Sequence, residues 1–242
     1  MTSLGSRATL EDMFTGSINY RGKSVAVDSV SLLPDCAGRW ILDYGCGQAP
    51  KRKQILSFGA RWVGIDVAGS DATIRCDGHM LPFKDGAFDA VLADAVFEHL
   101  VNPFKGMQEI ARVCKRGGRV VGYVAFLEPF HVSYFHHSHR SIEHLLGMSG
   151  FVVTDILPSR SGIEKLVEDM LFPSRIRFVT FIVSMGVRSV LFTLKRLLWG
   201  AAAAAPFLKG ERREARRRKL ELYRTFLEVA YAAGLTFRGV KA

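Results

Sequence analysis

The chain is short of the features that define several protein classes. Its 242 residues include only four cysteines, at positions 36, 46, 76 and 114, and no two of them form a Cys-x-x-Cys pair. This spacing argues against both a disulfide framework and a structural zinc site. The first residues, MTSLGSRATLEDMF, lack the apolar core of a signal peptide. We therefore expect a protein of the reducing cytoplasm.

Excess positive charge is absent from the first part of the chain and concentrated in the second. Residues 1–150 carry 16 Lys and Arg against 15 Asp and Glu, so residues 151–242 hold the other 17 of the 33 basic residues against 8 of the 23 acidic ones. A nearly neutral first part argues against a nucleic-acid groove, so nucleic acid is an unlikely partner. The cationic second part suits an anionic membrane, contacted peripherally from the cytoplasmic face.

Short apolar runs alternate with helical patterns through the middle of the chain. The runs WILDYG, WVGIDV, ATIRC, FDAVLAD, RVVGYVAF and FVVTDIL predict strands, and residues 50–58, 103–114 and 141–148 predict helices. This alternation is typical of a mostly parallel sheet. The fold class predicted is α/β: a Rossmann-like, doubly wound sheet with helices on both faces, over residues 40–158.

Two flanking regions accompany this domain. Residues 1–39 predict a helical or irregular lid, and residues 159–242 predict a basic, hydrophobic helical region with helices near 162–172, 174–199 and 209–233. Residues 235–240 fit a strand that returns to the edge of the sheet, which leaves open whether the helical block is an extension or an insertion.

The segment 174–199 allows three interpretations. Its 17 residues from Phe178 to Leu194 carry one charge, Arg188, and a central arginine costs about 2.5–3.5 kcal/mol on insertion into a bilayer. The segment therefore caps the substrate pocket, lies in the plane of a membrane, or spans it.

The strongest chemical signal is ILDYGCGQAP, residues 41–50. An apolar strand ends at Asp43, a Gly-x-Gly turn follows at Gly45 and Gly47, and Pro50 opens a helix. Glycine lets the backbone approach a ligand closely. Asp66 ends the next strand, 19 residues after Gly47, where a carboxylate can accept the two hydroxyls of a ribose. Together the two elements predict a nucleotide-like ligand.

The segment CDGHMLPFKDGAFDAV and the later FEHL complete a recognisable series. With ILDYGCG and GIDV, in this order over about residues 38–155, they resemble the class I S-adenosylmethionine-dependent methyltransferases of the type 11 group. The resemblance implies S-adenosyl-L-methionine as cofactor. It places Gly45 and Gly47 by the methionine part and Asp66 on the ribose, and Asp43 is a further candidate for cofactor binding. Around the adenine it places Asp77, Gly78, His79 and Met80, and Asp94 lines the floor near the methionine.

One departure from the family pattern and two alternative functions bear on this resemblance. Many relatives carry a third glycine where this chain has Ala49. A NAD(P)-dependent oxidoreductase also uses a glycine-rich turn and a distant acidic residue, but Pro50 would then occupy its third small position, and the turn at Asp77 would have no purpose. A non-catalytic module that binds S-adenosylmethionine is the other alternative.

Histidines supply the candidates for proton transfer and acceptor binding. His99 follows the strand that bears Asp94 and is the candidate catalytic base for a hydroxyl acceptor. His136, His137 and His139 are candidates for substrate binding; since no carboxylate accompanies them at metal-ligand spacing, no metal site is predicted. The sequence thus predicts an O-methyltransferase acting on a small or lipid-linked acceptor, sugar or quinone-like, that releases S-adenosylhomocysteine.

Overall fold

The computed structural model describes residues 18–20, 28–128, 132–159 and 213–242, together with isolated positions between 162 and 197. A seven-stranded sheet forms its centre, in the order β3-β2-β1-β4-β5-β7-β6. Six strands run in the same direction, and β7 alone of the seven runs antiparallel to them, between β5 and β6. The strands are β1 (Trp40–Tyr44), β2 (Arg61–Asp66), β3 (Ile74–Arg75), β4 (Phe88–Asp94), β5 (Cys114–Ala125), β6 (Phe151–Pro158) and β7 (Gly234–Lys241).

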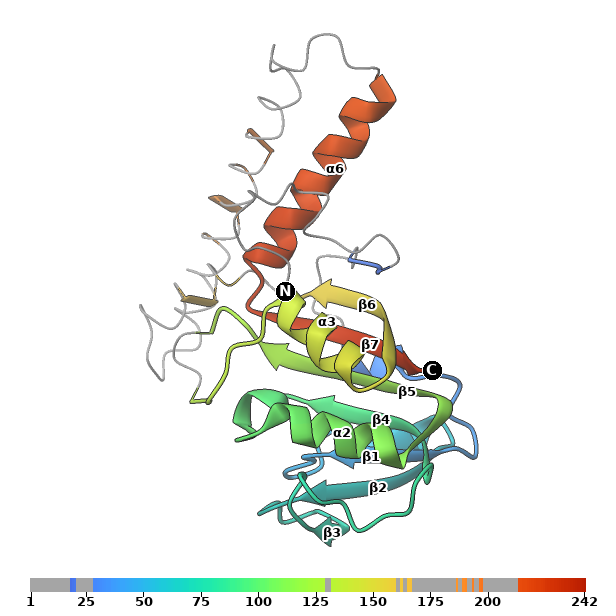
Figure 1. The fold of residues 1–242 in the computed structure, drawn as a ribbon. Helices are drawn as coiled ribbons and strands as arrows, with labels where there is room; N and C mark the ends of the chain where they lie inside the picture. The colour runs from blue at the N-terminus through green and yellow to red at the C-terminus, as the bar shows by residue number, and fades with distance from the viewer. Residues whose placement is uncertain are drawn as a thin grey trace.

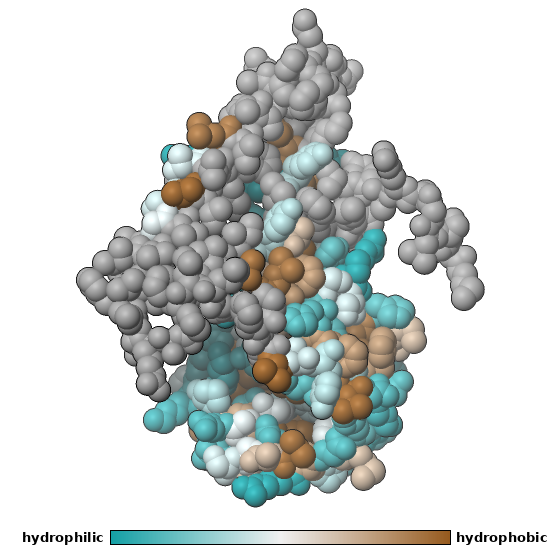
Figure 2. All heavy atoms as spheres, turned by 90° about the vertical axis from the view of Figure 1, so that its left-hand side faces the viewer, coloured by the Kyte–Doolittle hydropathy of each residue, from teal (hydrophilic) through white to brown (hydrophobic). Residues whose placement is uncertain are grey.

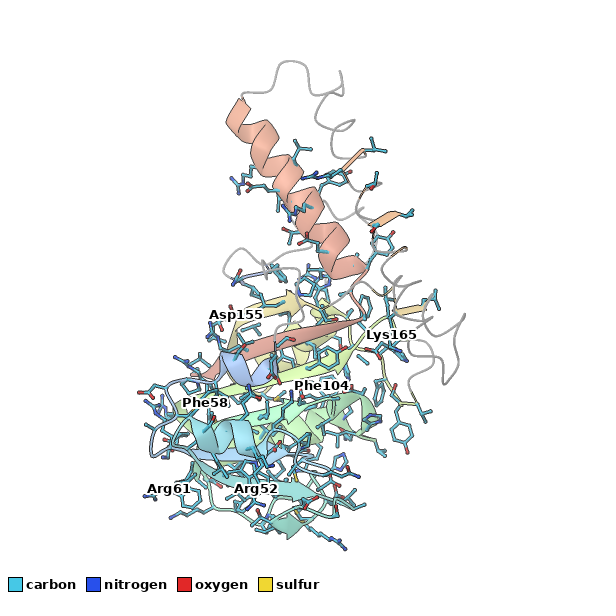
Figure 3. All side chains as sticks on the ribbon, turned by 180° about the vertical axis from the view of Figure 1, so that it is seen from behind. Arg52, Phe58, Arg61, Phe104, Asp155 and Lys165 are labelled. Carbon is cyan, nitrogen blue, oxygen red and sulfur yellow. The ribbon has the colours of Figure 1, made fainter. Side chains whose placement is uncertain are left out.

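Helices cover both faces of this sheet, as the sequence predicted. On one face lie α2 (Pro103–Val113) and α3 (His139–Met148), in front of the sheet in Figure 1. The other face carries α1 (Arg52–Ser57) and the 3₁₀ helix η1 (Ser29–Leu32), and Figure 3 shows α1 from that side, with Arg52 and Phe58 at its two ends. The Rossmann-like α/β prediction is confirmed.

Each face has its own apolar core. Fully buried Leu42 and Val91 belong to the cluster on the α2 and α3 face, whereas Ile41 and Leu92 belong to the cluster beneath α1 and η1. Neighbouring residues of one strand point to opposite faces, so a strand covered on both sides is apolar at successive positions. The runs ILDY and AVLA owe their continuous hydrophobicity to this arrangement.

The C-terminal strand corrects one detail of the sequence-based prediction. β7 lies between β5 and β6, so β6 and not the returning strand forms this edge of the sheet. Burial gives the physical reason, because Leu235 and Phe237 are fully buried and pack between two hydrogen-bonded neighbours. Asn19 makes an isolated parallel bridge to Asp155 on the outer side of β6.

The residues between β6 and β7 form an insertion within the order of strands. Its described helix, α6 (Arg213–Ala230), projects past β6 in Figure 1. Most of the predicted segment 174–199 lies outside the described residues. Within the described part of the chain, no helix combines the length and apolar character needed to cross a bilayer.

Candidate cofactor site

The site lies where the order of strands reverses direction, at the carboxyl ends of β1 and β4. Parallel α/β sheets bind ligands at this position, because the loops after the two strands diverge and leave a crevice. The loop after β1 contains Gly45 and Gly47, and Asp94 is the last residue of β4, before the loop that follows it. Figure 2 faces the side of the molecule toward which β5 points in Figure 1, where polar and hydrophobic residues are interspersed.

The two glycines of the loop have different tasks. Gly45 has φ +73°, and an ideal Cβ there would lie 2.6 Å from Cγ2 of Val96, so the loop after β4 packs against it. Gly47 has φ +53°, and a Cβ there would meet no atom within 4 Å. Only Gly47 therefore presents open space to a ligand, and both positions adopt a backbone conformation that favours glycine.

Ala49 explains how the chain manages without a third glycine. Its φ is +50°, so alanine occupies the left-handed conformation that glycine adopts at no steric cost. The loop keeps the backbone path of the glycine-rich motif and carries strain. Ala95, directly after Asp94, has φ +57° and makes the second such alanine of the described chain. The two strained residues flank the same crevice, as strain at functional sites often does.

Replacing Ala49 with glycine should stabilise the protein. Relief of the left-handed strain contributes about 1–2 kcal/mol, and the greater freedom of glycine in the unfolded chain offsets about 0.4–1 kcal/mol of it. We expect a gain of roughly 0.5–1 kcal/mol in the free energy of unfolding, measured by denaturant titration. The exposed Ala37, whose φ is not positive, is the matched control, and Ala37→Gly should destabilise. A loss of stability in Ala49→Gly would show that the loop is not strained there.

Asp66 fastens the turn after β2 to the glycine loop. Its Oδ2 accepts the backbone N–H of Gly47 at 2.9 Å, and its Oδ1 accepts those of Ala68 and Gly69 at 2.8 and 2.7 Å. Burial raises the pKa of Asp66, but these backbone hydrogen bonds outweigh it and the pKa is lowered. The backbone N–H of Val67 also contributes to this lowering. Through Oδ2 the carboxylate lies directly beside Gly47, where the loop is open.

Asp77 and His79 form the far end of the site. Asp77 Oδ1 accepts the backbone N–H of His79 at 2.9 Å and contacts its Nδ1 at 2.6 Å. His79 Nε2 accepts the N–H of Asn102, the N-cap residue of α2, at 3.2 Å. The ring therefore carries its proton on Nδ1. Since the Asp77 side chain is 66% exposed, its other oxygen faces solvent and can accept from an amine.

Gly78 and Met80 complete this turn in different ways. An ideal Cβ at Gly78 would lie 2.2 Å from the hydroxyl of Tyr44, so only glycine fits between that ring and the turn. Met80 is 78% exposed and offers an apolar side chain next to Asp77. Gly78 therefore packs against Tyr44, whereas the Met80 side chain lies open to solvent.

Asp43 and Asp94 differ in exposure. Asp43 is buried and accepts Trp62 Nε1 at 3.0 Å; burial raises its pKa to about 6, with the charge of Asp94 adding to the effect. Asp94 is half-buried at the end of β4 and accepts the hydroxyl of Ser29 at 2.7 Å. Asp94 is thus partly exposed at the carboxyl end of β4, whereas Asp43 is buried within β1.

A residue that the sequence interpretation passed over, Glu98, is fully buried beside His99. Its Oε1 accepts the backbone N–H of Ala125 at 3.2 Å, and its carbonyl accepts the N–H of Tyr134 at 2.8 Å. Burial raises the pKa of Glu98 to about 7. The ring of His99, by contrast, is exposed at the end of the short helix η2 (Phe97–His99). The only available sequence signal for Glu98 was its place in the FEHL segment, shortly after β4.

The three histidines of the SYFHHSHR segment do not share one environment. His136 is exposed and its Nδ1 donates to the carbonyl of Phe126 at 2.9 Å. His137 is buried against Ser141, 2.8 Å away, and burial lowers its pKa. His139 begins α3 and lies edge-on to Tyr20. Among the described residues no group of three potential ligands could hold a metal ion, and all four cysteines are unpaired.

These residues fit the cofactor that the resemblance implies. The open backbone at Gly47, the Asp66 carboxylate beside it and the exposed carboxylate of Asp77 suit, in turn, an amino-acid chain, a ribose and an adenine amine. The same edge combines several carboxylates, which suits the positive charge of a sulfonium.

Comparison with known proteins agrees with this geometry. Residues 42–122 match the family model described as a methyltransferase domain. An uncharacterized methyltransferase of Mycobacterium leprae is 30% identical over 131 residues, covering 45% of this chain and 49% of its own. The demethylmenaquinone methyltransferase of Clavibacter sepedonicus is 34% identical over 99 residues, covering 35% and 40%. The chain spans about half the length or less of these curated relatives.

A solved structure extends the likeness in fold. It is the complex between the Haloferax volcanii Trm112 methyltransferase activator and a putative methyltransferase. The match has a TM-score of 0.52 at 18% identity and covers 88% of this chain and 86% of the other. Residues 42–122 therefore form a methyltransferase domain of the S-adenosylmethionine-dependent class, as the motifs predicted. S-adenosyl-L-methionine is the cofactor of this class.

Proposed function

We propose that this chain transfers a methyl group from S-adenosylmethionine to the oxygen of a small or lipid-linked acceptor. The observation that carries the proposal is the Asp66 carboxylate, which accepts the N–H of Gly47 and therefore lies beside the open part of the loop. When bound, S-adenosylmethionine supplies a methyl group on a sulfonium and leaves as S-adenosylhomocysteine.

The protein's contribution is alignment and exclusion of water. Asp66 and Asp77 hold the nucleoside end, and Asp94 at the end of β4 directs negative potential toward the sulfonium. His99 is our candidate proton acceptor for a hydroxyl, because it comes shortly after Asp94 in the chain and is exposed. We retain His136 and His139 as candidates for acceptor binding; the burial of His137 gives it a task in fixing the start of α3.

Apolar side chains near the site favour a hydrophobic acceptor. The loops after β4 and β5 expose Val101 and Tyr134, at 73% and 69%, and Phe104 at the start of α2 is 43% exposed. Exposed apolar groups beside a polar cofactor site are typical of a surface that binds an apolar ligand. The demethylmenaquinone methyltransferase named among the relatives acts, by its name, on a quinone-type molecule. We therefore favour a quinone-like or lipid-linked acceptor over a free sugar.

The two alternative functions are less well supported. Dinucleotide-binding folds have the all-parallel order 3-2-1-4-5-6, whereas here the antiparallel β7 separates β5 from β6. A module that binds S-adenosylmethionine without turnover would keep the same cradle and would lack an acceptor.

Release of S-adenosylhomocysteine tests the proposal. The protein is incubated with S-adenosylmethionine and, in separate reactions, a short-chain hydroxyquinone, a lipid-linked sugar and a water-soluble sugar. We expect turnover with an apolar hydroxyl acceptor and none with the soluble sugar. Cofactor binding without turnover on any acceptor would instead support the non-catalytic module.

We further propose that the protein associates with anionic membranes through residues 174–219, which join an apolar segment to a basic run. Binding driven by charge weakens as salt screens it, while burial of an apolar face resists salt. We expect flotation with anionic vesicles at low salt, partial release at about 0.5 M salt and little flotation with neutral vesicles. Protein that stays with the soluble fraction under every condition would contradict this proposal.

A further inference from the structure

Lys51 lies between the glycine loop and the rest of the site. It directly precedes α1 and follows the strained loop by two residues. Its Nζ lies 2.8 Å from Oδ1 of Asp28 and 3.6 Å from Oδ2 of Asp94. The side chain is 28% exposed, so its ammonium is neither free in solvent nor sealed in the core.

The partners of Lys51 are satisfied without it. Asp28 also accepts Gln54 Nε2 at 3.0 Å and caps η1 at the N–H of Val30. Asp94 accepts the hydroxyl of Ser29 at 2.7 Å. An ammonium has three donors, and the 3.6 Å separation from Asp94 is longer than a good hydrogen bond. Lys51 therefore has donor capacity left and can shift toward another anion at small cost to its neighbours.

Lys51 interacts electrostatically with several carboxylates of the site. The pKa of Asp43 is lowered by Lys51 and raised by Asp94 and Asp66, in addition to the larger effect of burial. Burial lowers the pKa of Lys51, but the hydrogen bond to Asp28 and the charge of Asp94 outweigh it and the pKa is raised. Lys51 is thus a cation at neutral pH, within electrostatic reach of carboxylates on β1 and β4.

The end of the cofactor nearest the glycine loop is an amino acid, with an ammonium and a carboxylate. The carboxylates at this edge suit its ammonium and sulfonium, whereas its carboxylate needs a cation. We infer that Lys51 binds the α-carboxylate of the cofactor's methionine group, while Asp94 interacts with the positively charged groups of the cofactor. This inference rests on the proposed function and assigns a residue that the motifs do not contain.

Two ligands distinguish binding of the methionine carboxylate by Lys51 from a general effect of Lys51 on cofactor binding. S-adenosylhomocysteine carries the amino acid, whereas 5′-methylthioadenosine has the same nucleoside and thioether without it. Lys51→Gln should weaken binding of S-adenosylhomocysteine by about 10-fold, the scale of one lost charge-assisted hydrogen bond. Binding of 5′-methylthioadenosine should change by less than about 2-fold. Calorimetry measures both dissociation constants, and Lys53→Gln, at an exposed position of α1, should alter neither.

A second variant excludes a purely structural role. Asp28→Asn removes the closest partner of Lys51 and leaves the lysine in place, so it should retain or improve affinity for S-adenosylhomocysteine. The inference is overturned if Lys51→Gln weakens both ligands equally or neither, or if Asp28→Asn reproduces its loss. If the folded wild-type protein binds neither ligand, the proposed function itself fails, which is a separate and recognisable outcome.

Discussion

Asp66→Ala is expected to weaken binding of S-adenosylmethionine by roughly 10- to 150-fold, which corresponds to about 1.5–3 kcal/mol. The carboxylate would bond the ribose hydroxyls and already holds the N–H groups of Gly47, Ala68 and Gly69. Its removal takes away a charged acceptor and loosens the loop that must face the ligand. Calorimetric titration of the purified variant measures the loss.

A matched control keeps this result interpretable. Asp71 is an exposed aspartate on the connection between β2 and β3 and bonds only its neighbour Ser70 in the described contacts. Asp71→Ala should bind the cofactor like the wild-type protein, and both variants should retain a cooperative unfolding transition. A folded Asp66→Ala protein with unchanged affinity would remove Asp66 from the ribose site.

Glu98→Gln is expected to abolish a pH dependence of stability. The pKa of Glu98 in the folded protein is about 7 because of burial, against an ordinary value of 4.5. Between these two values the unfolded chain releases a proton that the folded protein keeps, so the free energy of unfolding falls as pH rises through this window. The difference of about 2.5 pH units corresponds to at most about 3 kcal/mol. Above pH 7 the contribution is constant.

Denaturant titrations at pH 4.5, 6 and 8 measure this effect as the difference between wild type and variant. Relative to wild type, Glu98→Gln should gain stability as pH increases and level off above pH 7. Glu109 gives the opposite sign, because its hydrogen bond with Arg112 lowers its pKa. Glu109→Gln should therefore be less stable than wild type by a constant amount above pH 4.5, and this deficit should shrink as pH falls below 4.5. A wild-type-minus-variant difference for Glu98 that is flat with pH would mean that this carboxyl is ionised normally.

The fold was predictable where the sequence pattern is strongest. Runs such as FDAVLAD predicted β4 at the residues where it occurs, because burial on both faces leaves an unbroken apolar signal. The helix predicted to reach residue 114 ends at Val113, since Cys114 already belongs to β5. The position of β7 was not predictable, because strand order depends on pairing between segments distant in sequence, such as Val120 with Gly239.

In the candidate site, too, local features were predictable and long-range contacts were not. Gly47 and Asp66 could be selected as candidates because a turn and a strand end are local features with fixed spacing, whereas the hydrogen bond that joins them was not predicted. Lys51, Ser29 and Glu98 were not predicted, because their roles depend on partners that only the folded chain brings near. Ala49 shows a third case, in which the residue departs from the motif while the backbone keeps its conformation.

Calorimetric titration of the full-length protein with S-adenosylmethionine and, separately, with NAD tests the central claim most directly. The account predicts one binding site per chain for S-adenosylmethionine, with no heat of binding for NAD at comparable concentrations. A folded protein that binds NAD, or that leaves S-adenosylmethionine unbound, would contradict it.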